Sequence, residues 1–250
     1  MTLLAVERIK LFTTRSPWWC ALITLVITIG FGALIAGTAP DSVAIDVGTT
    51  EFGYNFGIAV IMVLAALSVT TEYRFGTMRT TFQAVPHRGS VLAAKAAVVG
   101  LLALVIGELG GFGAWALASV LRPNNDLGLN TAAEWTNVAG VGVLFAIAAI
   151  IAVAVGILIR HSAGAIALLL IYSLAVESLV SLIPTVGPNI HKWLPFNVAD
   201  KFLRGSPGAG ADGPPPSDAV LSPGWALAYF AGFALVLMAV AIGVAKKRDA

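Results

Sequence analysis

The chain has 250 residues, of which 58% are hydrophobic and only 11% are charged. A soluble domain has about 45–50% apolar and about 25% charged residues, so this composition excludes a soluble globular protein and fits a protein whose solvent is the bilayer. The formal net charge of +2 says little about partners, and the single cysteine, Cys20, excludes an internal disulfide bond.

Six stretches are apolar and long enough to cross a membrane as helices, which requires roughly 20 residues each. They are residues 18–37, 52–70, 91–121, 137–159, 164–183 and 224–245. Every proline falls between these stretches, as expected if the helices end where proline removes a backbone donor. The sequence therefore predicts an all-α integral membrane protein with six transmembrane helices, in which residues 1–250 form one transmembrane domain.

The residues before the first stretch, 1–17, carry a short apolar stripe at helical spacing. Ala5 and Ile9 belong to this stripe, whereas Glu7 and Lys10 lie largely opposite it. We expect an interfacial helix that lies on the inner leaflet. A short disordered leader is the alternative.

The distribution of charge predicts the orientation. With the N-terminus in the cytoplasm, eleven of the 15 Lys and Arg residues fall on the cytoplasmic side. The four on the outer side are Arg122, Lys192, Lys201 and Arg204. Because positive loops stay in the cytoplasm, we expect a multi-pass protein of the plasma membrane with both termini inside the cell.

The cytoplasmic segment 71–90 is longer than a simple turn requires. We expect a short surface helix over residues 72–82, ended by Pro86, on which a cytoplasmic partner docks. The alternative is a solvated basic loop. Lys95 follows near the inner end of the third stretch, where its long side chain can reach the interface.

The residues of this segment resemble a pattern found in the permease subunits of ABC transporters of the type-2 exporter class. The matching residues are Glu72, Gly76, Thr77, Pro86, Arg88 and Lys95. In that family the segment carries the coupling helix, which docks on the ATPase subunit. The resemblance extends to the layout, with an N-terminal interfacial helix, six spans and an outer re-entrant element. That element is expected at residues 198–203, within the extracellular loop 184–223.

The resemblance implies the membrane-spanning subunit of an ATP-driven exporter, paired with a second copy or a sibling chain. The sequence contains no GxxxxGK(S/T) phosphate loop. We therefore expect no enzyme activity and no bound cofactor in this chain, with ATP and Mg²⁺ on separate cytoplasmic ATP-binding subunits. The implied coupling residues are Glu72, Tyr73, Arg74, Gly76, Thr77, Arg79, Pro86 and Arg88.

Two acidic residues, Glu108 and Glu177, fall within the apolar stretches. A carboxylate at the bilayer centre is unfavourable by roughly 2.5–3.5 kcal/mol unless it is paired or hydrated. These groups therefore line a wet cavity, bind a cation or relay protons, or else they are hydrogen-bonded carboxyls that hold helices together. Gly107 and Gly111 form a GxxxG pair, which serves either internal packing or a subunit interface.

Two other functions compete with the permease. An ion-coupled secondary transporter would use Glu108 and Glu177, but the sequence has no visible inverted repeat. A membrane protein without transport function would need a catalytic or assembly feature, and neither catalytic nor metal-ligand spacing is visible. Nucleic-acid modules are also lacking. The strongly apolar spans favour an amphipathic or lipid-like substrate.

Overall fold

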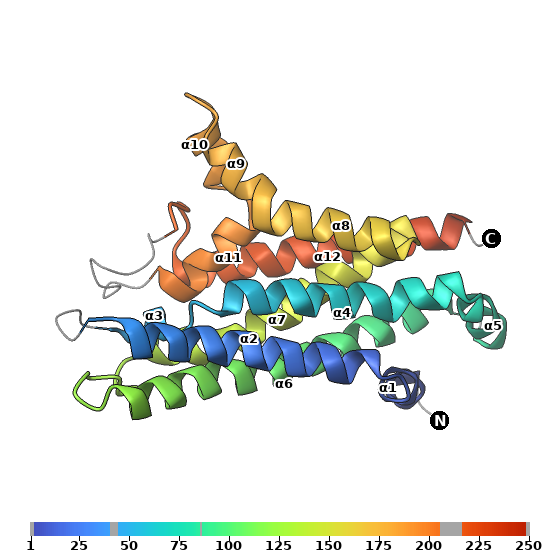
Figure 1. Cartoon of the computed structure of the whole chain (residues 1–250). Coiled ribbons are helices and arrows are strands. Elements are labelled where there is room, and N and C mark those ends of the chain that lie inside the picture. Colours follow the sequence, from blue (N-terminus) through green and yellow to red (C-terminus); the bar gives the residue numbers. More distant parts are fainter. Residues whose placement is uncertain (1–2, 41–44, 86, 206–216, 249–250) are drawn as a thin grey trace.

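The computed structural model describes residues 3–40, 45–85, 87–205 and 217–248, and within these ranges it contains helices and no strands. In chain order the helices are α1 (Leu3–Phe12), α2 (Ser16–Thr38), α3 (Val47–Thr50), α4 (Tyr54–Arg74), α5 (Thr77–Ala84), α6 (Arg88–Leu121), α7 (Ala132–Ile159), α8 (Ser162–Ile171), the π-helix η1 (Tyr172–Val176), α9 (Glu177–Ser181), α10 (Gly187–His191), α11 (Pro195–Arg204) and α12 (Pro223–Arg248). Figure 1 shows the long helices running side by side.

Six helical segments are long and apolar enough to span a membrane, which confirms the predicted number. They are α2, α4, α6, α7, the continuous run α8–η1–α9 and α12. The fourth span begins at Ala132 rather than at residue 137, because Thr131 and Glu134 form a capping box there. Within the fifth span the backbone widens into a π-helix over Tyr172–Val176.

The expectation of a surface helix over residues 72–82 is wrong at its start. Helix α4 continues through Arg74, and α5 begins only at Thr77. Gly76 separates the two helices with φ 73°, a left-handed conformation that glycine adopts without a steric penalty. Pro86, which was expected to end this helix, lies outside the described residues, as do residues 206–216 of the predicted extracellular loop.

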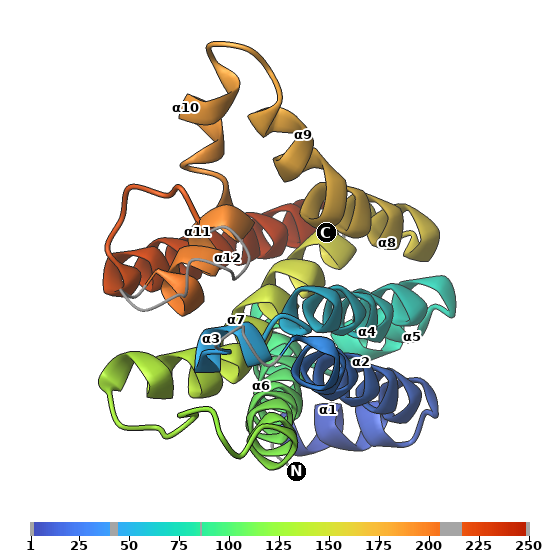
Figure 2. The same ribbon diagram turned by 60° about the vertical axis from the view of Figure 1, so that its left-hand side comes forward.

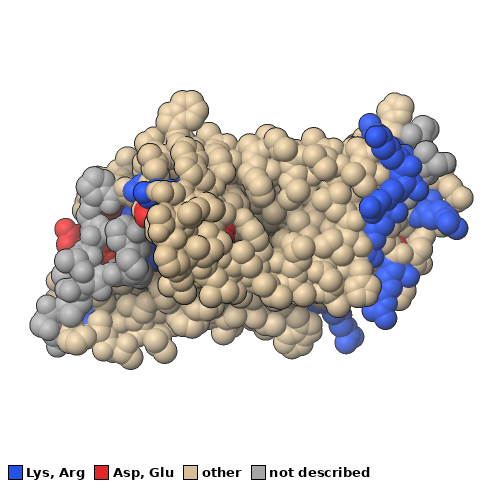
Figure 3. All heavy atoms as spheres, turned by 90° about the horizontal axis from the view of Figure 1, so that it is seen from above, with Lys and Arg blue, Asp and Glu red and all other residues tan. Residues whose placement is uncertain are grey.

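The two ends of the helical bundle differ in charge. Lys and Arg side chains gather at the end that carries both termini (Figure 3), which we call the basic end. Tryptophans lie at both ends. Trp18 and Trp19 are in the first turn of α2 at the basic end, whereas Trp135 and Trp225 are in the first turns of α7 and α12 at the opposite end. All four rings are more than half exposed, as expected for anchors at the two membrane interfaces.

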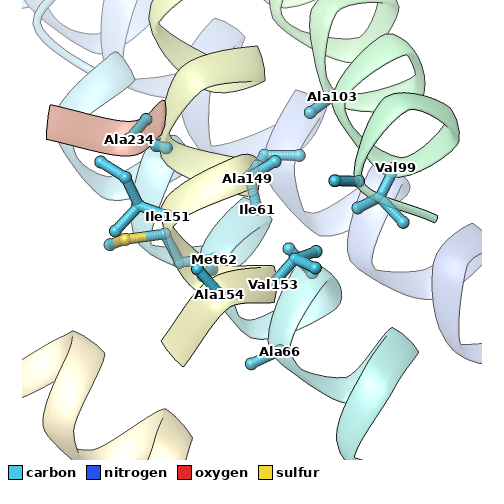
Figure 4. Close-up of a cluster of buried hydrophobic side chains, with 14 of the residues drawn as sticks. Ile61, Met62, Ala66, Val99, Ala103, Ala149, Ile151, Val153, Ala154 and Ala234 are labelled. Carbon is cyan, nitrogen blue, oxygen red and sulfur yellow. The ribbon is translucent and has the colours of Figure 1, made fainter. Parts of the chain in front are cut away.

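Helix α7 is the central element of the bundle. It packs against α4, α6, α8, α11 and α12, as Figures 1 and 2 also show. Small and branched side chains fill the interface, with Ala149 and Val153 of α7 near Ile61 and Ala66 of α4 and Ala103 of α6 (Figure 4). By contrast, α9 and α10 project away from the other helices (Figures 1 and 2).

The GxxxG pair serves contact within the chain. A Cβ at Gly107 would lie 2.6 Å from Gly142 Cα, and one at Gly111 would lie 2.6 Å from the Val138 carbonyl oxygen. Both neighbours are backbone atoms of α7, so α6 and α7 approach each other closely only because these positions lack a side chain. Of the two predicted roles, internal packing is therefore the one observed.

Gly107→Ala is expected to lower the free energy of unfolding by about 1–3 kcal/mol, because the added methyl group must displace the backbone of α7. Thermal unfolding in detergent measures the effect. Gly232→Ala is the matched control, since a Cβ at Gly232 meets nothing within 4 Å. Equal unfolding midpoints for the two variants would contradict the packing argument.

Glu51, which follows α3 at the end opposite the basic end, is buried and poorly satisfied. Its side chain accepts a hydrogen bond of 3.4 Å from the Thr50 hydroxyl, while Oε2 has no hydrogen-bond partner among the described residues. Burial disfavours the charged form and raises the pKa of Glu51 well above its ordinary value, although the Thr50 hydroxyl opposes this shift.

Glu51→Gln is expected to stabilise the protein in a pH-dependent way. Because the folded-state pKa exceeds the unfolded one, wild-type stability falls as the pH rises from about 4.3 through the folded-state pKa. The neutral amide removes this loss, so the variant should be the more stable protein at neutral pH, and the difference should disappear in acid. Unfolding midpoints across a pH series measure it, and a difference independent of pH would refute the assignment.

Candidate functional site

The junction between α4 and α5 forms a sharp corner at the basic end. The Phe75 backbone N–H donates to the Thr71 carbonyl (2.9 Å), which completes the last turn of α4. Gly76 then turns the chain, and the Thr77 hydroxyl donates a hydrogen bond to the Glu72 carbonyl (3.3 Å). The segment predicted to couple to an ATPase is therefore a two-helix corner with a defined backbone.

Helix α5 has one buried face and one exposed face. Met78 is only 2% exposed and packs into the main core, with Phe82 against it one turn later. Arg79 points outward, and Phe75, just before the helix, is 72% exposed beneath the Arg74 guanidinium (5.6 Å to the ring centre). An exposed aromatic ring between two arginines is a composition enriched at protein interfaces.

Behind this corner, the ammonium group of Lys95 is buried between two carboxylates. Lys95 Nζ donates to Glu7 Oε2, to Glu72 Oε1 (2.8 Å) and to the Ser68 carbonyl (3.5 Å), which uses all three of its donors. The side chains of Lys95 and Glu7 are 4% and 3% exposed. Lys95 therefore does not snorkel to the interface as expected, because two opposite charges satisfy it inside the protein.

A second ammonium group extends the network to α5. Lys10 Nζ donates to Glu7 Oε1 (3.0 Å) and to the Thr81 hydroxyl (3.0 Å), and it lies 3.7 Å from Glu72 Oε2. The four charged groups come from α1, α4 and α6, and Thr81 belongs to α5. We call Glu7, Lys10, Glu72 and Lys95 the charge network. It joins four helices at the basic end.

The remaining predicted coupling residues surround this corner. The Arg160 guanidinium stacks on Tyr73 at 4.8 Å and links α4 to the α7–α8 hairpin. Arg88, at the start of α6, lies over the Phe82 ring at 5.8 Å. Glu72 is turned toward Lys95 within the chain, so its carboxylate supports the corner from behind, whereas the exposed surface is formed by Arg74, Phe75 and Arg79.

Sequence reasoning missed the contribution of α1. The predicted apolar stripe placed Glu7 on a polar face, but Glu7 is among the most buried residues of α1, while Ile9 is 48% exposed. Glu7 and Lys95 are 88 positions apart, so no local periodicity connects them. The one available signal was that Lys95 is a lysine within an apolar stretch, which requires a partner of opposite charge.

Glu177 is hydrogen-bonded to the N-terminus of α11. Its two carboxylate oxygens accept hydrogen bonds from the backbone N–H groups of Phe196 (3.0 Å) and Asn197 (2.7 Å), in the first turn of α11. These donors have no partner within the helix, and a negative charge is favourable at a helix N-terminus. Glu177 thus holds α11, where the re-entrant element was expected, against the fifth span.

Glu108 is separate from Glu177. It lies half-buried on α6, close to Gly142 of α7, whereas α9 packs against α10 and η1. The two intramembrane acids therefore belong to different parts of the structure. Among the described residues, no three His, Cys, Asp or Glu side chains gather so as to hold a metal ion.

Lys95→Met is expected to reduce stability by about 3–5 kcal/mol, because it leaves the Glu7 and Glu72 carboxylates buried with only Lys10 nearby. Thermal unfolding in detergent measures the loss, with the exposed Lys246→Met as the control. Adding Glu7→Gln to Lys95→Met should recover part of the loss, since one uncompensated charge disappears. Strictly additive losses would show that the two groups are not coupled.

The sequence profile described as "ABC-2 family transporter protein" matches residues 3–176, well over half of the chain. The match includes the charge network, the α4–α5 corner and Glu108. No curated protein gives a significant match. The chain therefore belongs to the ABC-2 transporter family, a family of membrane-spanning transport subunits that are not themselves catalytic.

Proposed function

We propose that this chain is the permease of an ATP-driven exporter, in which separate cytoplasmic ATPase subunits dock on the α4–α5 corner. The observation that carries the proposal is the exposed surface of Arg74, Phe75 and Arg79 on a corner that is braced from behind by the charge network. Movement of an attached ATPase would reach α4 and α6 through groups that are already bonded to one another.

The location of the basic residues supports a cytoplasmic position for this corner. The positive-inside rule assigns the basic end, with both chain termini, to the cytoplasm. Soluble ATP-binding subunits are present only on that side. ATP and Mg²⁺ would be bound by those subunits, because the sequence of this chain has no phosphate loop.

A second copy or a sibling chain would complete the pathway. Much of α2, of the fifth span and of α12 is exposed in the single chain. Gly30 on α2 and Gly243 on α12 have open space around them. Small residues on outward faces let helices of two subunits approach closely in lipid. These faces support a dimer built around α2 and α12.

An ion-coupled secondary transporter remains the alternative, but it has less support. Its two proposed carboxylates are Glu108 and Glu177, and the latter is engaged by the first turn of α11. Glu108 is therefore the one carboxylate of the two that is not engaged by backbone N–H groups of a neighbouring helix. A single half-buried carboxyl near one helix pair is a weaker basis than the α4–α5 corner.

Arg79→Glu is expected to weaken binding of the ATPase by at least about tenfold, because the reversal places a negative charge on the docking surface without touching the core. The measurement is purification from native membranes, with an ATP-binding protein identified and quantified by mass spectrometry. Lys247→Glu is the matched control, since Lys247 is also exposed at the basic end, on α12.

Two results would overturn the proposal. One is that no ATP-binding protein accompanies the wild-type chain under any solubilisation condition. The other is that Arg79→Glu and Lys247→Glu retain the ATPase equally well, which would indicate docking elsewhere on the basic end.

A further inference from the structure

A pocket of about 510 Å³ opens beside the charge network, between α1, the first turn of α2, α4 and α6. On α4 it extends from Glu72 to Leu64, eight positions that correspond to about 12 Å along the helix axis. The lining residues of α4 recur every three or four positions, so they form one continuous face. The pocket is therefore an elongated slot that runs along a spanning helix.

The two ends of the slot differ in polarity. Leu64 and Leu67 of α4 and Val98 and Val99 of α6 form an apolar wall. The opposite end contains the charge network together with several Ser and Thr hydroxyl groups, among them Ser16, Thr14 and Thr71. A slot with one apolar and one polar end matches a molecule that has an alkyl chain and a polar head group.

The polar end has two unsatisfied hydrogen-bonding positions. Glu72 Oε2 is buried and has no hydrogen-bond partner among the described residues. Lys10 uses two of its three N–H groups on Glu7 and Thr81, and the third faces Glu72 Oε2 across 3.7 Å, too far for a hydrogen bond. A head group with one donor and one acceptor would satisfy both positions.

The charges of the network predict the net charge of the ligand. Two ammonium groups and two carboxylates sum to zero, so the site offers no net attraction to an anionic or a cationic molecule. A zwitterion is different, because its ammonium can bind Glu72 while its phosphate accepts from Lys10. Such charge-assisted hydrogen bonds are the stronger kind.

The polar end of the slot lies at the level of a membrane interface. Ser16 and Pro17 line the pocket, and the next two residues, Trp18 and Trp19, are the exposed rings that open α2. Such tryptophans settle at the head-group level of the bilayer. A lipid of the adjacent leaflet therefore reaches the polar end of the slot without leaving the membrane.

We propose that this slot binds one bilayer lipid with a zwitterionic head group that carries N–H donors, with its ammonium on Glu72 Oε2, its phosphate on Lys10 and an acyl chain between α4 and α6. Lipid binding at this site requires no ATPase, although Phe75 of the α4–α5 corner also lines the pocket. It places the lipid in contact with the network that joins α1, α4, α5 and α6.

The test is native mass spectrometry of the purified chain, with phosphatidylethanolamine, phosphatidylcholine and phosphatidylglycerol supplied in equal amounts. The wild type should retain one phosphatidylethanolamine per chain, about tenfold over either competitor, because phosphatidylcholine lacks the N–H donors and phosphatidylglycerol is anionic. Leu67→Trp, which fills the slot, should lose this lipid. Leu101→Trp, on an exposed position of α6, should retain it.

Glu72→Gln provides a readout that does not require filling the slot, because it should reduce the preference for phosphatidylethanolamine over phosphatidylcholine. Unfolding midpoints confirm that each variant is folded, and Leu67→Phe replaces Leu67→Trp if the larger residue prevents folding. Equal retention of the three lipids, preference for phosphatidylglycerol, or unchanged retention in the filled variant would each overturn the proposal.

Discussion

The burial of one ammonium group, that of Lys95, determines how the basic end of this protein is organised. An unpaired charge there would be strongly unfavourable, so the chain must bring carboxylates to it. Glu7 arrives on α1 and Glu72 on the last turn of α4, and both contact Lys95 on α6. Once these three helix ends are fixed, Gly76 turns the chain into α5, and Lys10 connects that helix to α1 through Thr81. The position of the α4–α5 corner thus follows from a charge that lies behind it.

The remainder of the bundle depends on close helix contact rather than on charge. In lipid there is little hydrophobic drive for helices to associate, so small residues and shape complementarity determine which helices touch. The glycines of α6 allow the backbone of α7 to approach, and α7 in turn packs on α4, α11 and α12. On the far side Glu177 anchors α11 through its backbone donors. The two kinds of contact divide the molecule into a centre packed through small residues and a corner held by charged groups.

Most of the fold could be predicted from the sequence, because hydropathy and proline placement identify spans without any knowledge of tertiary contacts. The number of spans is confirmed, and so is the expectation that glycines lie at helix contacts. The site was less predictable. From its sequence neighbours alone, Glu72 has the pattern of an exposed loop charge. In the structure α4 continues through Arg74, so Glu72 lies in the last turn of a helix, and this directs its side chain toward Lys95. The carboxylate partners of Lys95 lie 88 and 23 positions away, and the backbone partners of Glu177 lie 19 and 20 positions away. Only the folded chain brings these groups together.

The most direct test of this account is the distance between α1 and α5, measured by double electron–electron resonance in a Cys20→Ala background with spin labels at positions 8 and 83. Both positions are exposed, so the labels do not disturb the core. If the charge network holds these helices as one unit, the wild type gives a single narrow distance distribution, and Lys95→Met broadens it markedly. An equally narrow distribution in Lys95→Met would contradict the account, because the corner would then be held by contacts other than the buried ammonium group.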